Sequence, residues 1–115
     1  MRFTRSMKEN HLFRRLYAKG KNAVSPTLAV YARRNRLEYT RLGLTVGTKV
    51  GKAVRRNQVR RRIKEAYRVH EGGLLPGWDV VVVARVRAAH ASYAEVERDL
   101  LRLLDKLGIR RRQTP

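Results

Sequence analysis

Residues 79–86 read DVVVVARV, an almost continuous apolar run built mainly from the β-branched residue valine. A strand with one face in water alternates apolar and polar residues, whereas a continuous apolar run is typical of a strand covered on both faces. The run is far too short to span a membrane. The rest of the chain must therefore supply the neighbouring strands and helices that bury this segment.

Two further segments have the spacing of amphipathic helices. The first is predicted to begin after Ser6, which forms a capping-box pattern with Glu9, and to end at Gly20. Its apolar residues at helical spacing are Leu12, Phe13, Leu16 and Tyr17. The last helix is predicted to follow a second capping box, Ser92 with Glu95. Its apolar stripe consists of Val96, Leu100, Leu103, Leu104 and Leu107.

Alternating residues predict strands at 27–35 and 39–47, and a short strand is expected near 22–26. The polar segment 33–38 is short enough for a hairpin loop between the two longer strands. The predicted fold is therefore α+β, a two-layer α/β sandwich with a roughly four-stranded central sheet and three helices. Residues 1–115 are expected to form one domain, with 110–115 as a frayed basic tail.

Charge restricts the partners of this domain. The chain has 28 Lys and Arg residues against 9 Asp and Glu, a formal charge of +19, and 43% of its residues are hydrophobic. That apolar content is too high for a disordered basic tail, so a folded body carries the charge. A polyanion is the expected partner, and nucleic acid is favoured over an anionic membrane or the target of a secreted toxin. The absence of cysteine, of a signal peptide and of a long apolar run favours a cytoplasmic protein with no membrane partner.

The middle helix, predicted over 52–70, has the most unusual charge pattern. Its core side is expected to be Val59, Ile63, Ala66 and Tyr67. An arc of about 100° on the other side holds Asn57, Arg60, Arg61, Lys64 and Arg68. Clustered like charges destabilise an isolated helix, and a merely solvated face usually alternates signs. Arginine forks match phosphate geometry, so we expect this arc to bind a phosphate backbone, of DNA or of RNA.

Aromatic residues suggest contact with unpaired bases. Phe13 and Tyr17 lie one helical turn apart, and Tyr31 lies on the strand face opposite the apolar set of that strand. Aromatic rings beside positive charge form stacking platforms for single strands. The alternative is that Phe13 and Tyr17 pack in the core. Neither acids nor histidines have the spacing of a catalytic or metal site, so the protein alone is expected to cleave nothing.

Residues 49–67, KVGKAVRRNQVRRRIKEAY, resemble the signature of the bacterial ribonuclease P protein family, approximately K-x-G-x-A-V-x-R-N-x-x-K-R-x-x-R. The identical positions are Lys49, Gly51, Ala53, Val54, Arg56, Asn57 and Arg61. Arg60 and Lys64 are like-charge replacements, whereas Gln58 and Arg62 depart from the common pattern. The similarity extends to the first helix and to the three longer strands.

The resemblance implies a left-handed crossover into the last strand, contrary to the general rule. It also implies that an RNA is the catalyst, removing the 5′ leader of precursor tRNA with Mg²⁺ held mainly by RNA. The residues implied to bind the catalytic RNA are Lys49, Lys52, Arg56, Asn57, Arg60, Arg61, Lys64 and Arg68. Those implied to line a leader cleft between the first helix and the sheet are Phe13, Tyr17 and Tyr31. A structural RNA-binding protein, such as a ribosomal protein, and a DNA-binding regulator are the alternatives.

Overall fold

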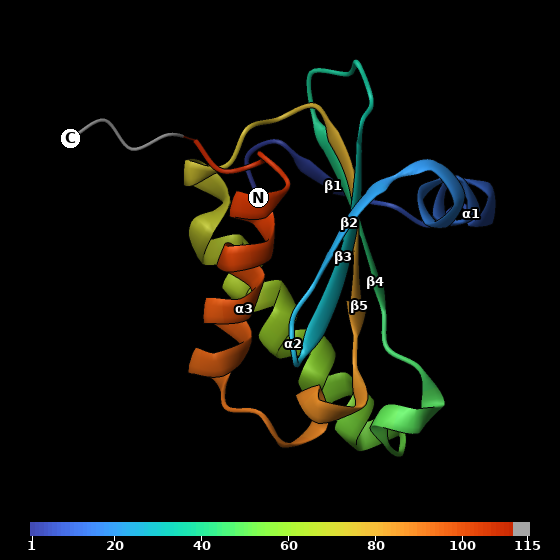
Figure 1. The fold of residues 1–115 in the computed structure, drawn as a ribbon, viewed down its shortest axis with the longest axis vertical. Helices are drawn as coiled ribbons and strands as arrows, with labels where there is room; N and C mark the ends of the chain where they lie inside the picture. The colour runs from blue at the N-terminus through green and yellow to red at the C-terminus, as the bar shows by residue number, and fades with distance from the viewer. Residues whose placement is uncertain (112–115) are drawn as a thin grey trace.

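The computed structural model describes residues 1–111 as one mixed sheet with helices on both faces (Figure 1). The strands are β1 (Thr4–Ser6), β2 (Lys21–Val24), β3 (Leu28–Arg34), β4 (Thr40–Thr45) and β5 (Trp78–Ala84). The helices are α1 (Asn10–Lys19), α2 (Ala53–His70) and α3 (Tyr93–Lys106). The α+β prediction is confirmed, and the sheet has five strands rather than four, in the order β1-β4-β5-β3-β2.

The order of the strands contradicts the predicted hairpin between β3 and β4. β5 lies between them, antiparallel to β3 and parallel to β4, so the intervening loop crosses over the end of β5. The valine-rich β5 is the strand that gains most from a central position, because both its edges and both its faces are then covered. α2 forms the crossover from β4 to β5. The left hand of that crossover stays a prediction.

Both faces of β5 are buried, as its sequence predicted. On one face, Val80 and Val82 pack with the apolar stripes of α2 and α3 in the main core. The four core residues expected on α2, Val59, Ile63, Ala66 and Tyr67, are all buried. On the other face, Val81 packs against Leu12 and Leu16 of α1 in a smaller cluster. Figure 1 shows this division, with α2 and α3 on one side of the sheet and α1 on the other.

The two capping boxes have opposite outcomes. Ser92 caps α3, since its Oγ accepts a hydrogen bond from the Glu95 N–H at 3.2 Å. The box at Ser6 is wrong: Ser6 belongs to β1, which pairs with β4, and α1 begins only at Asn10 without a side-chain cap. Gly20 ends α1 as predicted, and its N–H donates to the Leu16 carbonyl at 2.8 Å.

Backbone contacts hold the C-terminal segment as far as Arg111, beyond the point at which the tail was expected to begin. Arg110 forms a β-bridge with Leu74, and the Arg111 N–H donates to the Gly73 carbonyl at 2.8 Å. Residues 110 and 111 therefore differ from the predicted frayed tail, while 112–115 lie outside the described residues. Among the helices of residues 1–111, none combines the length and the apolar content that a bilayer crossing requires.

Glu71 fastens the N-terminal strand to the end of α2. Its carboxylate accepts hydrogen bonds from the N–H groups of Arg2 at 2.6 Å and Phe3 at 3.4 Å. Burial opposes ionisation of Glu71, but hydrogen bonds from Thr4, Arg2 and Phe3 and the nearby N-terminal ammonium hold its pKa below the ordinary 4.5. The ionised form therefore stabilises the fold above that pH.

We expect Glu71→Gln to lower the free energy of unfolding at pH 7 by up to about 1.5–3 kcal/mol, the range for hydrogen bonds to a charged group. Because the folded-state pKa is depressed, the gap between wild type and variant should narrow as the pH falls below 4.5. Denaturant titrations from pH 7 to pH 3 measure this gap. A gap that stays constant with pH would contradict the assigned role.

Candidate nucleic-acid interface

α2 presents the predicted basic face to solvent. Asn57, Arg61, Lys64 and Arg68 are exposed, and Arg60 is partly exposed. Arg60 donates from Nη1 to Asn57 Oδ1 at 3.1 Å, which aligns the two side chains along the helix. Arg68 is held by Glu65 through two hydrogen bonds of 2.6 and 3.0 Å, so part of its charge is compensated. The face therefore offers adjacent guanidinium and amide donors suited to phosphate oxygens.

The residues at the edges of this face hold α2 in place. Arg55 donates to the Ala89 carbonyl and Arg62 to the Ala91 carbonyl, each at 3.1 Å. Arg62, which departs from the family pattern, thus links α2 to the segment before α3. Arg56 is only partly exposed, and its buried Nε has no hydrogen-bond partner among the described residues.

Lys49 and Lys52 lie in the turn that leads into α2, and both are exposed. Lys49 belongs to the short 3₁₀ helix Thr48–Val50, and Lys52 occupies the N-cap position of α2. Gly51 between them has φ of +150°, and a Cβ there would lie 3.0 Å from the Arg55 side chain. This turn therefore requires glycine, and it places both lysines at the N-terminal end of the basic face.

Tyr17 and Tyr31 form an edge-to-face pair on the sheet face opposite α2 and α3. Their ring centroids lie 5.0 Å apart at an interplanar angle of 89°. The Tyr17 hydroxyl shares a hydrogen bond with Thr45 Oγ1 at 2.9 Å, which fixes the ring over the sheet. Tyr17 is 43% exposed, so its ring is available to a ligand.

The other aromatic residue of α1, Phe13, is less available. Leu12 and Leu16 are buried beneath α1, and Phe13 is partly buried beside them. The Phe13 ring lies against Gly43 of β4, where a Cβ would come within 2.5 Å of it. Phe13 therefore supports α1 on the sheet and presents only part of its ring. Tyr31 is partly buried as well, so Tyr17 is the most exposed of the three rings.

A depression of about 740 Å³ lies on the same side of the sheet. Its lining residues are Pro26, Thr45, Gly47, Thr48, Lys49, Val50, Val83, Ala84, Arg85, Val86 and Arg87. Thr45, which contacts Tyr17, and Lys49, from the signature, both belong to its wall. We call the depression together with Tyr17 and Tyr31 the aromatic groove. One side of the molecule thus joins a stacking platform to positive charge.

Sequence reasoning missed the basic residues that follow β5. Arg85 donates from Nη1 to the Ser25 carbonyl at 2.7 Å, and Arg87 is exposed in the groove wall. The sequence offered one signal for these two residues, which is that they follow directly after a central strand. Within residues 1–111, no three His, Asp or Glu side chains come together in a way that could hold a metal ion.

The sequence and the fold are similar to those of known proteins. Residues 1–108 match the family Ribonuclease P. The Ribonuclease P protein component of Clostridioides difficile is 37% identical over 107 residues, covering 92% of this chain and 94% of the relative. That of Alkaliphilus metalliredigens is 39% identical over 109 residues, covering 95% and 98%.

Solved structures agree with these relatives. The RNase P protein of Staphylococcus aureus superposes with a TM-score of 0.84 at 31% identity, covering 90% of this chain and 95% of that one. The RNase P protein of Thermotoga maritima gives a TM-score of 0.81 at 30% identity, covering 89% and 96%. Since the family match spans nearly the whole chain and the fold is shared, this chain belongs to the ribonuclease P protein family.

Proposed function

We propose that this chain is the protein subunit of a ribonuclease P, an endoribonuclease complex that removes the 5′ leader of precursor tRNA. The observation that carries the proposal is the pair of the exposed Tyr17 and the partly buried Tyr31, which borders a depression walled by Lys49 of the signature. A single strand needs both stacking surfaces and positive charge. A purely structural RNA-binding protein, such as a ribosomal protein, needs no such groove and is not favoured.

The proposal assigns the two RNA partners to two different surfaces of the protein. The catalytic RNA is bound by the signature residues Lys49, Lys52, Arg56, Asn57, Arg60, Arg61, Lys64 and Arg68. The leader is bound by Phe13, Tyr17 and Tyr31, with most of the stacking on Tyr17 because Phe13 and Tyr31 are partly covered. Arginine forks suit a structured phosphate backbone, and flat aromatic rings suit unpaired bases of any sequence.

The chemistry is assigned to the RNA partner. The described acids and histidines do not converge into a Mg²⁺ site, so the proposal places the Mg²⁺ of the assembled enzyme mainly on the RNA. The protein contributes by holding the leader and by neutralising phosphates where two RNAs meet, because uncompensated phosphates on two RNAs would repel each other. We place this assembly in the cytoplasm.

One reconstitution tests the proposal. Precursor tRNA is incubated with the protein, with the cognate catalytic RNA, and with both at low Mg²⁺. We expect 5′ cleavage with both components, weaker cleavage with the RNA alone, and none with the protein alone. Cleavage by the protein alone would overturn the assignment of the chemistry, and no stimulation of the RNA by the protein would overturn the proposed function.

We expect the double variant Arg60→Ala, Arg61→Ala to bind the catalytic RNA more weakly while keeping its fold, because both side chains lie away from the buried Val59 and Ile63. A plot of log affinity against log salt concentration should become shallower by about 0.7–0.9 for each lost phosphate contact. The same plot for Arg102→Ala, Lys106→Ala on exposed positions of α3 is the charge-matched control. Equal slopes for the two variants would mean that this face does not touch the RNA backbone.

A further inference from the structure

A second groove, rich in arginine, lies at the end of the sheet near the β3–β4 loop. It has a volume of about 670 Å³. Its lining residues are Arg15, Arg33, Arg34, Asn35, Arg36, Leu37, Arg41, Pro76, Gly77 and Asp79. We call it the arginine groove. Neither the signature helix nor the aromatic groove shares a residue with it, so the function proposed above leaves it unexplained.

Most of the charge in this groove is uncompensated. Asp79 is the only acid in the lining, and it forms a two-pronged ion pair with Arg41, with N–O distances of 2.7 and 2.8 Å. Among residues 1–111, no carboxylate lies within ion-pair distance of the other four arginines, Arg15, Arg33, Arg34 and Arg36. The guanidinium of Arg34 lies over the Trp78 ring, 6.0 Å from its centroid, on the sheet face of the main core. The charges of Arg15, Arg33 and Arg36 therefore remain around the depression, and they repel one another unless an anion lies between them.

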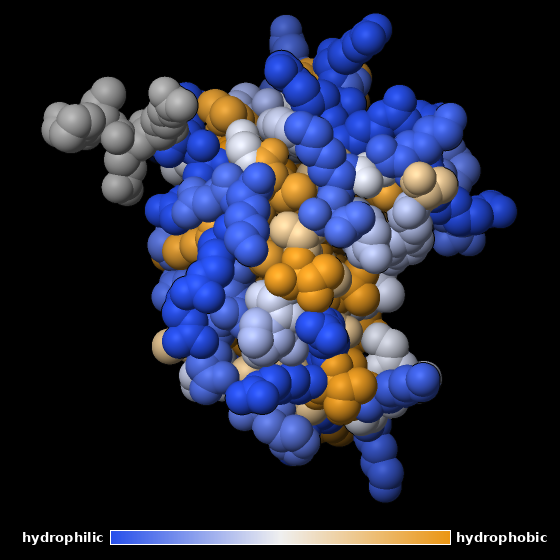
Figure 2. Space-filling model, viewed as in Figure 1, coloured by the Kyte–Doolittle hydropathy of each residue, from blue (hydrophilic) through white to orange (hydrophobic). Residues whose placement is uncertain are grey.

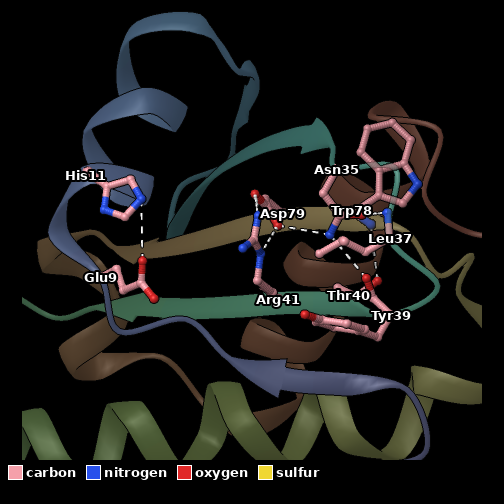
Figure 3. A network of polar contacts seen from close by, with 9 residues as sticks. All are labelled: Glu9, His11, Asn35, Leu37, Tyr39, Thr40, Arg41, Trp78 and Asp79. Atoms are coloured by element: carbon pink, nitrogen blue, oxygen red, sulfur yellow. Dashed lines mark hydrogen bonds and ion pairs between the residues drawn. The ribbon is translucent and has the colours of Figure 1, made fainter.

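The β3–β4 loop, which carries Arg36 and directly follows Arg33 and Arg34 of β3, is fixed before any ligand binds (Figure 3). Asn35 donates to the Tyr39 carbonyl at 3.1 Å and to Asp79 Oδ1 at 3.0 Å, and its Oδ1 accepts from the Leu37 N–H at 2.8 Å. Within this turn Arg36 has φ of +63°, a left-handed conformation that is uncommon for arginine. The backbone that places Arg36 in the groove lining is therefore ordered in advance, which lowers the cost of binding to that of ordering the side chains.

The arginine groove and the aromatic groove occupy the same face of the sheet, on either side of α1. Tyr31 and Arg33 are two residues apart on β3, so their side chains point to the same face about 7 Å apart along the strand. Between them α1 packs on Val81 through its leucines. The side chain of Tyr17 projects from one side of α1, toward Tyr31, and that of Arg15 projects from the other side, into the arginine groove.

Positive charge continues across the outer surface of α1 between the two grooves. At 3.6 residues per turn, Arg14 projects from the outer side of the helix, between the directions of Tyr17 and Arg15, and it is exposed. In Figure 2 the surface over α1 and over the β3–β4 loop, at the top and upper right, is largely hydrophilic. A strand that leaves the aromatic groove can therefore pass Arg14 and reach Arg33 and Arg36.

We propose that the arginine groove binds the phosphate backbone of the upstream part of the precursor's 5′ leader, after the leader has crossed α1. This inference rests on the proposed function, because it extends the strand held by Tyr17 and Tyr31. A run of phosphates fits the groove better than one phosphate ion, since the three uncompensated arginines Arg15, Arg33 and Arg36 exceed the charge of a single group. The leader must first cross the width of α1, about 10–12 Å with its side chains.

The test compares two charge-matched double variants in the assembled enzyme. Arg33→Gln, Arg36→Gln removes two exposed charges from the arginine groove and leaves the Arg41–Asp79 pair intact. Arg102→Gln, Lys106→Gln removes two exposed charges from α3, on the other face of the sheet. Affinity is measured for mature tRNA and for precursors whose leaders lengthen one nucleotide at a time, across a range of salt concentrations.

We expect the wild type and the α3 variant to gain affinity in two stages, first when the leader fills the aromatic groove and again when it crosses α1. The Arg33→Gln, Arg36→Gln variant should keep the first gain and lose the second. With the longest leader, its plot of log affinity against log salt should be shallower than wild type by about 1.4, or 0.7 for each single-strand contact.

Three outcomes would overturn the inference. The first is a second gain that survives in Arg33→Gln, Arg36→Gln, and the second is a wild type that shows no second gain. The third is a loss that is independent of leader length and that also appears with the catalytic RNA alone, which would assign the groove to that RNA. If the wild type lacked the first gain in affinity, that result would instead contradict the proposed function. Failure of the inference and failure of the proposed function are therefore distinguishable.

Discussion

Truncation of Leu16 to alanine is expected to lower the free energy of unfolding by about 2–5 kcal/mol, the range for a buried leucine. Leu16 is 1% exposed and packs with Met7, Leu12 and Val81 in the cluster beneath α1. This cluster is small and separate from the main core, so few other contacts can compensate for the cavity. Urea titrations followed by circular dichroism measure the loss.

Leu16→Ala should also impair the aromatic groove, because the same cluster holds α1 and therefore Tyr17 over the sheet. Val69→Ala on α2 is the control: Val69 is 53% exposed, and its truncation should change stability by no more than about 0.5 kcal/mol. A Leu16→Ala variant as stable as Val69→Ala would mean that α1 does not depend on this cluster.

Local patterns predicted the elements that carry their own signal. The valine run predicted that both faces of β5 are covered, and the stripe of Val59 and Ile63 identified the buried side of α2. β1 was missed because three residues, largely polar, are too short to show alternation. The same strand explains the false capping box, since Ser6 pairs with β4 instead of capping α1.

Sheet order depends on contacts between distant segments, which local patterns do not specify. A short polar link between two alternating strands favours a hairpin, yet β5 lies between β3 and β4. Burial of apolar surface decides the order instead. The most apolar strand gains more stability from a central position than two half-polar strands gain from pairing with each other. The Asn35 contacts that fix the crossing loop became visible only with β5 in place.

The candidate site was predicted in part. The basic arc of α2 followed from helical spacing, because its residues are close in the sequence. The arginine groove did not, since it assembles Arg15, Arg33 and Arg41 from three different elements. Gly43 was an available signal that was not used: a glycine within a strand pattern suggests a close approach, here by the ring of Phe13.

Loss of the Tyr17 ring is expected to weaken binding of precursor tRNA to the assembled enzyme by about 1–3 kcal/mol, the value of one base–aromatic stack. Affinity for mature tRNA should stay nearly unchanged, because mature tRNA has no leader. The exposure of Tyr17 predicts only a modest loss of stability for Tyr17→Ala, about 0.5–1.5 kcal/mol for its edge-to-face pair with Tyr31. Binding to both tRNA forms and thermal melts of the free protein measure these quantities.

Tyr17→Phe separates the ring from its hydroxyl. This variant loses the hydrogen bond to Thr45 and keeps the aromatic face, so it should retain most of the leader-dependent affinity that Tyr17→Ala loses. If Tyr17 instead contributed mainly to the core, Tyr17→Ala would lower stability by about 3–5 kcal/mol and weaken both tRNA forms alike. That result would remove Tyr17 from the leader site. The stacking role would then fall to Phe13 and Tyr31, which are both partly buried.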